Sequence, residues 1–459
     1  MREPSPPACT TARMRAVRDD GRTWCRGMRP RLPDMSTGDR TYDLVLFGAS
    51  GFVGKLTAGH LAQHAPDGAR IALAGRTESK LQAVRDSLGP AAEGWDLLVA
   101  DAADEPRLAE LAASTKVVVT TVGPYAKYGM PLVAACARAG THYADLTGEV
   151  LFVRRSADAN HELAADTGAK IVHACGFDSI PSDLGVYLTA EQAKADGAGE
   201  LTQTTLYVRQ LKGGFSGGTI DSMRTQAIET RADAGDRKIV ADPYGLSPDR
   251  GAEPSRSGPR PPKATNPLSV AGGILKNLPV RRTADGHWTG PFVMASFNTR
   301  IVRRSNALLG HAYGTGFRYQ EVVDFGTSAK APVLAAGMTA GLLGVATGMQ
   351  FGPGRAVLDR VLPKPGEGPS PEAQEKGRFR MVIDARTTSG ARYETTVAAQ
   401  ADPGYSGTAV MLGQAGLCLA FDELPDRAGV LTPAVAMADA LTARLRAQDF
   451  TLETRRVEA

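Results

Sequence analysis

Short, nearly continuous apolar runs alternate with segments of helical spacing from Thr41 to about residue 190. Apolar runs of this length, bounded by glycine or polar residues, are typical of buried parallel strands. The pattern predicts strands at 42–48, 70–75, 95–100, 116–122, 142–146 and 170–174. It predicts helices between them, at 52–64, 79–88, 105–113 and 131–139. Strands that alternate with helices indicate a Rossmann-like, doubly wound parallel sheet.

The hydrophobic pattern changes after about residue 190. Longer segments with polar alternation predict an antiparallel sheet, with strands at 201–211, 292–303, 316–323, 378–386 and 391–399. Ser389 and Gly390 lie in the expected hairpin turn between the last two strands. Helical spacing returns at 407–421 and 433–447. We therefore expect an α/β fold with a second α+β domain, whose sheet is mainly antiparallel, and C-terminal helices.

These patterns divide the chain into four segments. We expect a disordered Arg- and Pro-rich extension at 1–40, a Rossmann domain at 41–188, an α+β substrate or lipid domain at 189–404, and helices that pack back on the Rossmann domain at 405–459. Met35 precedes a polar stretch and the first strand, so we interpret it as a candidate start of translation. The Pro-rich stretches 242–267 and 363–376 are predicted to be mobile loops.

Composition and charge exclude several classes of protein. With 42% hydrophobic and 22% charged residues, the chain has the composition of a globular protein. The net charge of +4 is accounted for by residues 1–34, so the remaining chain is neutral and a nucleic-acid partner is not expected. The five cysteines are scattered without a C-x-x-C motif, which argues against a metal site or a disulfide framework. A reducing cytoplasm is the expected location.

Residues 331–354 form a segment without a single charge. The segment is long enough to span a bilayer, but it is rich in glycine and alanine and poor in large apolar side chains. Three interpretations remain open: a buried helix, an interfacial or lipid-facing helix, and a spanning segment. The second would allow peripheral contact with the inner face of the plasma membrane.

The strongest motif lies between the first strand and the first helix. Its residues are Gly48, Ala49, Ser50, Gly51, Phe52, Val53 and Gly54. In this context the three glycines allow a tight turn, close approach of a pyrophosphate and close packing of helix on strand. The amides at the start of the helix then face the anion. The motif therefore predicts a dinucleotide site.

The residue after the second strand indicates which nicotinamide cofactor binds. NAD sites usually place an acid there, but this chain has Arg76, with Lys80 one turn further on. A guanidinium can pair with a 2′-phosphate, so we predict NADP(H). Asp101, after the third strand, is either an acceptor for the adenine or a helix cap. Thr121, Gly123 and Pro124 follow the fourth strand, and we expect their loop to pass the pyrophosphate or the nicotinamide.

A set of motifs spread along the chain carries a family resemblance. None of the eleven tyrosines has a lysine four residues later, so the short-chain dehydrogenase dyad is absent. The set comprises 48–54, 74–76, 123–125 with 128–129, 143–149, 176–183, 216–219, 302–306, 402–405 and 431–433. From residue 41 to about 450 the chain resembles the saccharopine dehydrogenase-like family, and within it the trans-acting enoyl reductases. The tail before Met35 falls outside the resemblance.

The resemblance implies a reaction and partners. It implies an NADPH-dependent reductase that acts on an acyl chain carried by the acyl carrier protein of a polyketide synthase, in lipid or glycolipid biosynthesis. Two other functions remain open: an imine reductase for a small amino-acid substrate, and a non-catalytic NADP-binding sensor or scaffold. Arg303 and Arg304 are either contacts for a carrier protein or solvated strand charges.

Reduction of an enoyl thioester requires a donor for the enolate oxygen and a proton for the α-carbon. Tyr125 and Tyr128 follow the fourth strand, so either could donate, or pack structurally. Asp178 and Ser179 follow the sixth strand at the same sheet edge; Ser179 could orient the substrate, whereas Asp178 could cap the next helix. Asp145 and Glu149 are interpreted as residues that could hold loops together.

Overall fold

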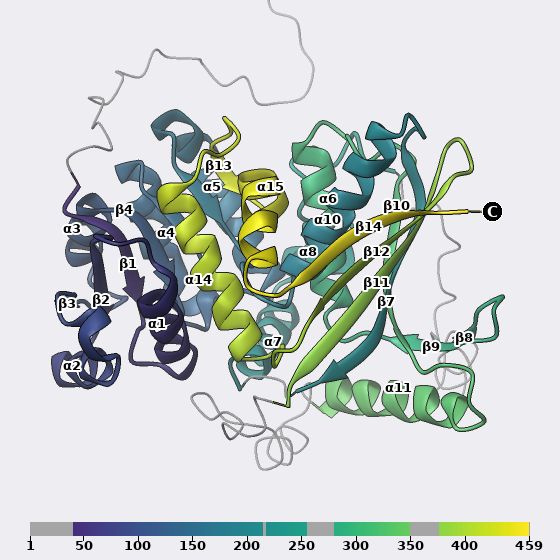
Figure 1. Cartoon of the computed structure of the whole chain (residues 1–459), viewed down its shortest axis with the longest axis horizontal. Coiled ribbons are helices and arrows are strands. Elements are labelled where there is room, and N and C mark those ends of the chain that lie inside the picture. Colours follow the sequence, from purple (N-terminus) through teal and green to yellow (C-terminus); the bar gives the residue numbers. More distant parts are fainter. Residues whose placement is uncertain (1–39, 214–216, 255–279, 349–375, 459) are drawn as a thin grey trace, which may run out of the picture. The chain divides into compact units, whose positions relative to one another are not determined.

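The computed structural model describes residues 40–213, 217–254, 280–348 and 376–458. The expected extension therefore lies outside the described residues except for Arg40, as do parts of the two predicted loops (255–267 and 363–375) and residues 349–354 of the uncharged segment. The described chain contains two sheets of seven strands (Figure 1).

The first sheet is parallel throughout and has the order β13-β6-β5-β4-β1-β2-β3. Its strands are β1 (Tyr42–Phe47), β2 (Ile71–Gly75), β3 (Asp96–Val99), β4 (Thr115–Thr120), β5 (His142–Ala144), β6 (Lys170–Val172) and β13 (Gly429–Leu431). The connecting helices are α1 (Phe52–His64), α2 (Glu78–Ser87), the 3₁₀ turn η2 (Gly89–Ala92), α3 (Glu105–Ser114), α4 (Tyr125–Ala139) and α5 (Val150–Thr167). The expected doubly wound sheet is confirmed.

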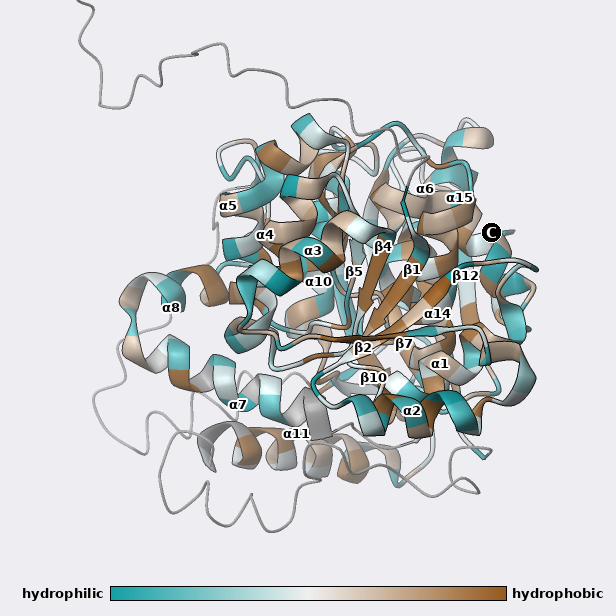
Figure 2. Cartoon of the chain, turned by 90° about the vertical axis from the view of Figure 1, so that its left-hand side faces the viewer, coloured by the Kyte–Doolittle hydropathy of each residue, from teal (hydrophilic) through white to brown (hydrophobic). Residues whose placement is uncertain are grey.

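Both faces of this sheet are covered by helices. Along β1, Leu44 and Leu46 belong to the hydrophobic cluster on one face, and Val45 and Phe47 to the cluster on the other. All four side chains are buried, which explains why the strand is a continuous apolar run rather than an alternating one. Figure 2 shows the hydrophobic strands β1 and β4 between their covering helices.

The second sheet is mixed, with the order β14-β12-β11-β7-β10-β9-β8. Its strands are β7 (Leu201–Lys212), β8 (Arg281–Arg282), β9 (Trp288–Pro291), β10 (Arg318–Asp324), β11 (Arg378–Thr387), β12 (Arg392–Ala399) and β14 (Thr451–Val457). All pairs are antiparallel except β7 with β10, so the expectation of a mainly antiparallel sheet is confirmed. The predicted hairpin joins β11 to β12, and Gly390 has a φ of +84° in its turn.

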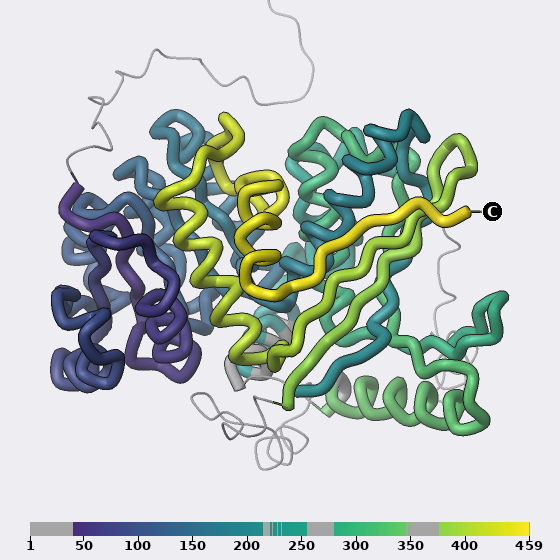
Figure 3. The backbone as a smooth tube through the Cα atoms, in the orientation of Figure 1, coloured from purple at the N-terminus to yellow at the C-terminus, as the bar shows by residue number. Residues whose placement is uncertain are grey.

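The remaining helices are α6 (Ile180–Ala195), α7 (Gly217–Ala232), α8 (Ala234–Ala241), α10 (Ala295–Leu308), α11 (Ala331–Gly348), α14 (Ser406–Phe421) and α15 (Pro433–Arg446). Helices α6 and α10 pack against the second sheet. Helix α14 packs against α1, β1 and β4 of the first sheet, and α15 packs against α6. Figure 3 shows the chain continuing from α14 and α15 into β14, beside β12.

The strand predicted at 292–303 is wrong. Residues 295–308 form helix α10, in which Phe297 and Ile301, four residues apart, are buried together with Val302. Aromatic and β-branched residues favour strands only weakly, and packing against α6 overrides that preference here. Helix α4 also begins at Tyr125, earlier than the predicted residue 131, with Pro131 inside it. The strands β13 and β14 were not predicted.

No helix among the described residues combines the length and apolar character needed to cross a membrane.

Candidate functional site

The glycine motif forms a tight loop between β1 and α1. Gly48 has a φ of +89°, and a Cβ atom there would lie 2.8 Å from both Thr121 Oγ1 and Val122 Cγ2. A Cβ atom on Gly54 would lie 2.1 Å from the carbonyl oxygen of Gly48. Any larger residue would therefore push the helix away from the strand. Gly51 is exposed, so the backbone of the loop is open to a ligand.

The start of α1 offers amides to that ligand. Gly51 is the N-cap, no side chain caps the helix, and its first turn carries no acid. The Ala49 side chain is buried in the core, so Ala49 can contribute only backbone atoms to a ligand. Phe52 packs edge-on against the ring of Tyr405, with the ring centroids 4.9 Å apart. The uncapped amides and the absence of acids suit a pyrophosphate.

Arg76 directly follows β2 and is exposed, as is Lys80 in α2. Among the described residues neither cation has an ion-pair partner, so both remain available to a 2′-phosphate. Asp101 is exposed and accepts a hydrogen bond from the amide of Ala103 at 2.9 Å. It therefore forms a turn ahead of α3, whose N-cap is Asp104.

Thr121 holds the glycine loop in place. Its Oγ1 donates to the carbonyl oxygen of Gly48 at 3.0 Å, which joins the end of β4 to the loop after β1. Gly123 and Pro124 follow, with Gly123 exposed and Pro124 at the N-cap of α4. The loop predicted to pass the cofactor therefore adjoins the glycine motif directly.

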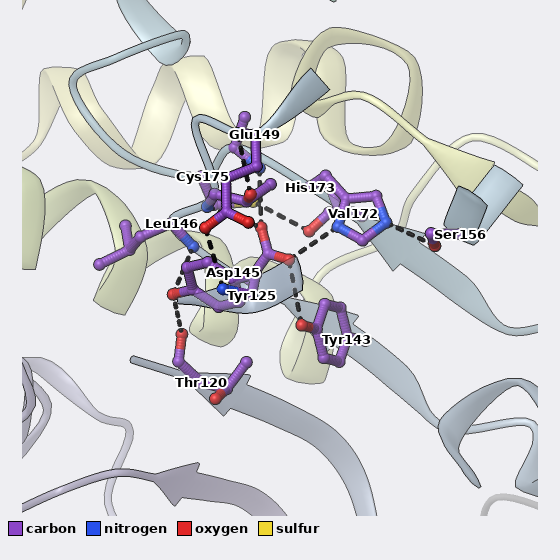
Figure 4. A network of polar contacts seen from close by, with 12 residues as sticks. Thr120, Tyr125, Tyr143, Asp145, Leu146, Glu149, Ser156, Val172, His173 and Cys175 are labelled. Carbon is purple, nitrogen blue, oxygen red and sulfur yellow. Dashed lines mark hydrogen bonds and ion pairs between the residues drawn. The ribbon is translucent and has the colours of Figure 1, made fainter. Parts of the chain in front are cut away.

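The hydroxyl of Tyr125 is fully engaged within the protein (Figure 4). It donates to the carbonyl oxygen of Thr120 and accepts from the amide of Leu146, each at 3.1 Å. Burial raises the pKa of the Tyr125 hydroxyl well above its usual value. This arrangement favours the alternative that Tyr125 packs structurally, because its proton is directed to a backbone carbonyl. Tyr125 instead ties the end of β4 to the end of β5.

Asp145 is the centre of a buried polar network (Figure 4). Its carboxylate accepts from Tyr143 Oη at 3.0 Å and from the amides of Thr147 and Ala174 at 3.1 Å and 3.0 Å. It also contacts His173 Nδ1 at 2.7 Å, while His173 Nε2 lies 2.8 Å from Ser156 Oγ. The interpretation of Asp145 as a loop holder is confirmed.

Glu149 has a similar role at the start of α4. Its carboxylate accepts from the amides of Tyr125 and Ala126 at 2.9 Å and 2.7 Å, and from Ser222 Oγ of α7 at 2.7 Å. Burial raises the pKa of Glu149, although these hydrogen bonds act in the opposite direction. The carboxylate thus joins α4, α5 and α7 at one point.

Asp178 and Ser179 are adjacent in sequence but differ in their surroundings. Ser179 is buried and donates to Asn298 Oδ1 at 3.2 Å. This contact favours a structural role for Ser179 over a contact with substrate. Asp178 is partly exposed, and its carboxylate has no hydrogen-bond partner among the described residues. The N-cap of α6 is Ser179, whose side chain makes no capping hydrogen bond, so Asp178 does not cap that helix.

The environment of Asp178 favours its protonated form. Its Oδ2 lies 3.8 Å from the position that a Cβ atom on Gly148 would occupy, and the same position is 3.6 Å from Met294 Cε. The protein displaces most of the water around this carboxyl group, which raises the pKa of Asp178 to about 6. It is a titratable acid beside the ends of β5 and β6.

Tyr128 lies on the first turn of α4, half-buried. The Nζ atom of Lys127 lies 4.9 Å from the centroid of its ring. A hydrogen bond with Tyr128 raises the pKa of Lys127. Tyr128 is thus a phenol next to a cation at the edge of the sheet that carries the glycine motif.

Sequence reasoning missed a second buried network, behind Ser179. Asn298 Nδ2 donates to Glu321 Oε2 at 3.1 Å and Tyr319 Oη to Glu321 Oε1 at 2.9 Å. Burial raises the pKa of Glu321 to about 7. No local signal marked these residues, because α10 and β10 bring Asn298 and Glu321 together only in the folded chain.

Arg303 and Arg304 are not surface charges of a strand. In α10, Arg304 donates to the carbonyl oxygens of Leu246 and Val430, each at 2.7 Å, and is buried. Arg303 donates to the carbonyl oxygens of Pro243 and Tyr319. The interpretation as solvated strand charges is therefore wrong, since the arginines hold segments of the chain together.

Comparison with known proteins places this geometry in a family. Residues 44–172 match the sequence profile of the saccharopine dehydrogenase NADP binding domain. The fold resembles saccharopine dehydrogenase (L-Glu forming) of Saccharomyces cerevisiae, with a TM-score of 0.51 at 14% identity over 90% of this chain and 99% of that one.

Relatives of known family cover nearly the whole chain. A Mycobacterium tuberculosis H37Rv protein named as a trans-acting enoyl reductase is 51% identical over 434 residues, which is 92% of this chain and 100% of the relative. The trans-acting enoyl reductase of Mycobacterium bovis BCG Pasteur is 49% identical over 436 residues, again 92% of this chain and 100% of the relative. The predicted NADP(H) cofactor agrees with these findings. The chain therefore belongs to the family of trans-acting enoyl reductases and carries a saccharopine dehydrogenase-type NADP-binding domain.

Proposed function

We propose that this protein is an NADPH-dependent oxidoreductase that reduces an α,β-unsaturated acyl thioester. The names of its relatives and its NADP-binding domain support this reaction. The name of the family implies a separate synthase, and we propose that the substrate arrives on the acyl carrier protein of a polyketide-type synthase that makes lipids or glycolipids. We assign cofactor binding to 41–188, substrate binding to 189–404, and closure of the fold to 405–459.

The residues that follow the strands of the first sheet around the glycine motif, here called the cofactor edge, fit NADPH. The open loop at Gly51 and the uncapped amides of α1 would hold the pyrophosphate, and Arg76 with Lys80 would hold the 2′-phosphate. Thr121 keeps the loop in shape through its bond to Gly48. Asp101, Gly123 and Pro124 would line the same edge. When bound, NADPH supplies the hydride that the β-carbon of the substrate accepts.

The assignment of the proton donor rests on the surroundings of Asp178. It is partly exposed, it has no hydrogen-bond partner among the described residues, and its pKa is raised to about 6. A carboxyl group with these properties can hold a proton near neutral pH and release it to carbon. We assign the α-carbon proton to Asp178, which is then recharged from solvent.

Tyr128 is assigned to the thioester oxygen. Its phenol would donate a hydrogen bond to the negative charge that develops there once the β-carbon is reduced. The neighbouring ammonium of Lys127 favours that role, because a nearby cation stabilises the negative charge that develops on the thioester oxygen. Tyr125 and Ser179 act as positioning residues that keep the strand ends in register.

NADPH oxidation in the presence of defined substrates tests the function. The protein would be offered a trans-2-enoyl chain on a carrier protein, with NADH and with an amino-acid and 2-oxo-acid pair in parallel reactions. We expect oxidation of NADPH that depends on the enoyl chain, with little oxidation of NADH. Turnover on the amino-acid pair would instead support an imine reductase. Tight NADPH binding without any turnover would support a sensor or scaffold.

A further inference from the structure

Helix α11 presents an apolar face to solvent. Of the large hydrophobic side chains exposed in the described part of the chain, the four on this helix include the two most exposed: Val333 at 71% and Leu334 at 55%, with Met338 and Leu343 at 40% each. The other exposed positions are Ala336, Gly337, Ala340, Gly341 and Gly344. Among the side chains of α11 that the structure describes, no charged or polar one interrupts this face.

The opposite side of α11 is attached to the second sheet. Ala331, Ala335 and Thr339, spaced four residues apart, are buried, and the helix packs against β9. The backbone of Ala335 lies 3.6 Å from the position that a Cβ atom on Gly290 would occupy. A surface helix normally turns its polar side to solvent and its apolar side to the protein. In α11 the side with small residues faces the protein, and the large apolar side chains face solvent. Val333 and Leu334 are exposed on the other side of the helix.

Cations lie beside this helix. Lys330 immediately precedes it and is exposed. Arg281 and Arg282 are exposed on β8, which pairs with β9, and Figure 1 shows both strands next to one end of α11. Asp285, in the turn between β8 and β9, is the exposed acid of this hairpin. Among the described residues, this hairpin and the residue before α11 thus carry more basic than acidic side chains.

We propose that α11 is an interfacial helix that docks on a bilayer containing anionic lipids. Interfacial helices insert an apolar face into the headgroup boundary and are strengthened by adjacent basic residues, which is the arrangement seen here. Protein interfaces are instead enriched in aromatic and arginine anchors, and none of the described side chains of α11 is of either kind. The inference does not depend on the enoyl reductase assignment.

Flotation of the full chain with lipid vesicles tests the proposal. We expect the protein to float with vesicles of phosphatidylcholine and phosphatidylglycerol, and less with phosphatidylcholine alone. A variant with Val333→Gln, Leu334→Gln and Met338→Gln should lose roughly tenfold or more of its vesicle affinity. A variant with Arg281→Glu and Arg282→Glu should bind anionic vesicles more weakly and lose most of the salt dependence of binding.

The control variant replaces exposed apolar residues elsewhere, with Val99→Gln and Phe421→Gln. It should float as the original protein does, and every variant should bind NADPH equally well, which separates docking from folding and from the reaction. The proposal would be overturned if the triple Gln variant floated with the vesicles as well as the original protein does. It would also be overturned by an absence of flotation together with a dimer that the triple Gln variant abolishes, because the face would then join two copies of the chain.

Discussion

At the scale of single residues, hydrogen-bond partners separate groups that can react from groups that hold the structure. Tyr125 and Asp178 both follow strands of the first sheet, at the edge where a nicotinamide would lie. The Tyr125 hydroxyl has two partners in the backbone, whereas the Asp178 carboxylate has none among the described residues. We therefore propose Asp178, rather than Tyr125, as the group that exchanges a proton with a substrate.

Replacement of Asp178 should remove a pH dependence. A proton donor acts in its protonated form, and with a pKa of about 6 the protonated fraction of Asp178 falls as the pH rises through that value. The turnover rate should then decline by about tenfold per pH unit above it. Asp178→Asn should lower turnover by roughly 100-fold or more and flatten the profile, with NADPH affinity unchanged. Steady-state kinetics across pH, with the exposed Glu93→Gln as control, would measure this.

If Asp178→Asn kept the original rate at every pH, the proton would have to come from another group, and Tyr128 or water would replace Asp178 in the mechanism.

Replacement of Arg76 should change cofactor preference. Arg76 is exposed and has no ion-pair partner among the described residues, so its guanidinium is available to a 2′-phosphate. Arg76→Ala should weaken NADPH binding by roughly 10- to 100-fold, because a charge-assisted hydrogen bond is lost, and leave NADH binding unchanged. Titration of both cofactors by fluorescence would measure the ratio. An equal loss for both cofactors would count against a specific contact with the phosphate.

At the scale of elements, single carboxylates join helices to strand ends. Glu149 precedes α5, accepts both first amides of α4 and is held by Ser222 of α7. A negative charge at the start of α4 also complements the dipole of that helix. The three helices therefore depend on one side chain.

Removal of the Glu149 carboxylate should destabilise this junction. Glu149→Ala leaves the buried amides of Tyr125 and Ala126 without acceptors, so we expect the free energy of unfolding to fall by about 2–4 kcal/mol. Glu149→Gln should cost less, because its amide oxygen still accepts a hydrogen bond. Ser222→Ala, which removes one bond, should cost about 1 kcal/mol. Urea unfolding followed by circular dichroism would rank the variants. If Glu149→Ala and Ser222→Ala lowered the free energy of unfolding equally, Glu149 would not join the three helices as described.

At the scale of the whole molecule, the last segment of the chain connects the two sheets. Strand β13 pairs with β6 of the first sheet and β14 with β12 of the second, while α14 covers β1 and β4. One hydrophobic cluster runs through both, from Leu44 in β1 to Ile383 in β11. We therefore expect the two sheets to unfold together.

Gly416 tests the packing of α14 on the first sheet. A Cβ atom there would lie 2.5 Å from Val119 Cγ2 and 2.9 Å from Leu44 Cδ1. Gly416→Ala should therefore lower the free energy of unfolding by about 1–3 kcal/mol in a single transition. The helical control Gly59→Ala, whose new methyl would meet only Leu88 Cδ2 at 3.9 Å, should raise it by about 0.5–1 kcal/mol. Thermal unfolding of both variants gives the comparison, and a stabilised Gly416→Ala would refute the tight packing.

Much of the cofactor edge could be predicted from the sequence because its signals are local. The strands of the first sheet are apolar runs, and Gly48, Gly51 and Gly54 meet backbone constraints within a few residues of one another. Arg76 follows its strand directly, so its position needed no information about distant segments. The hairpin at Gly390 was predictable for the same reason.

The parts that could not be predicted depend on residues far apart in the chain. The segment around Phe297 became a helix because α6 buries one side of it, and β13 joined the first sheet because β6 offered an open edge. By itself the sequence determined a doubly wound NADP-binding sheet, since strand periodicity and glycine turns are local properties. Only the tertiary structure decided that Tyr125 and Ser179 have hydrogen-bond partners while Asp178 has none within the described part of the chain, because a partner from a distant segment exists only once the chain has folded.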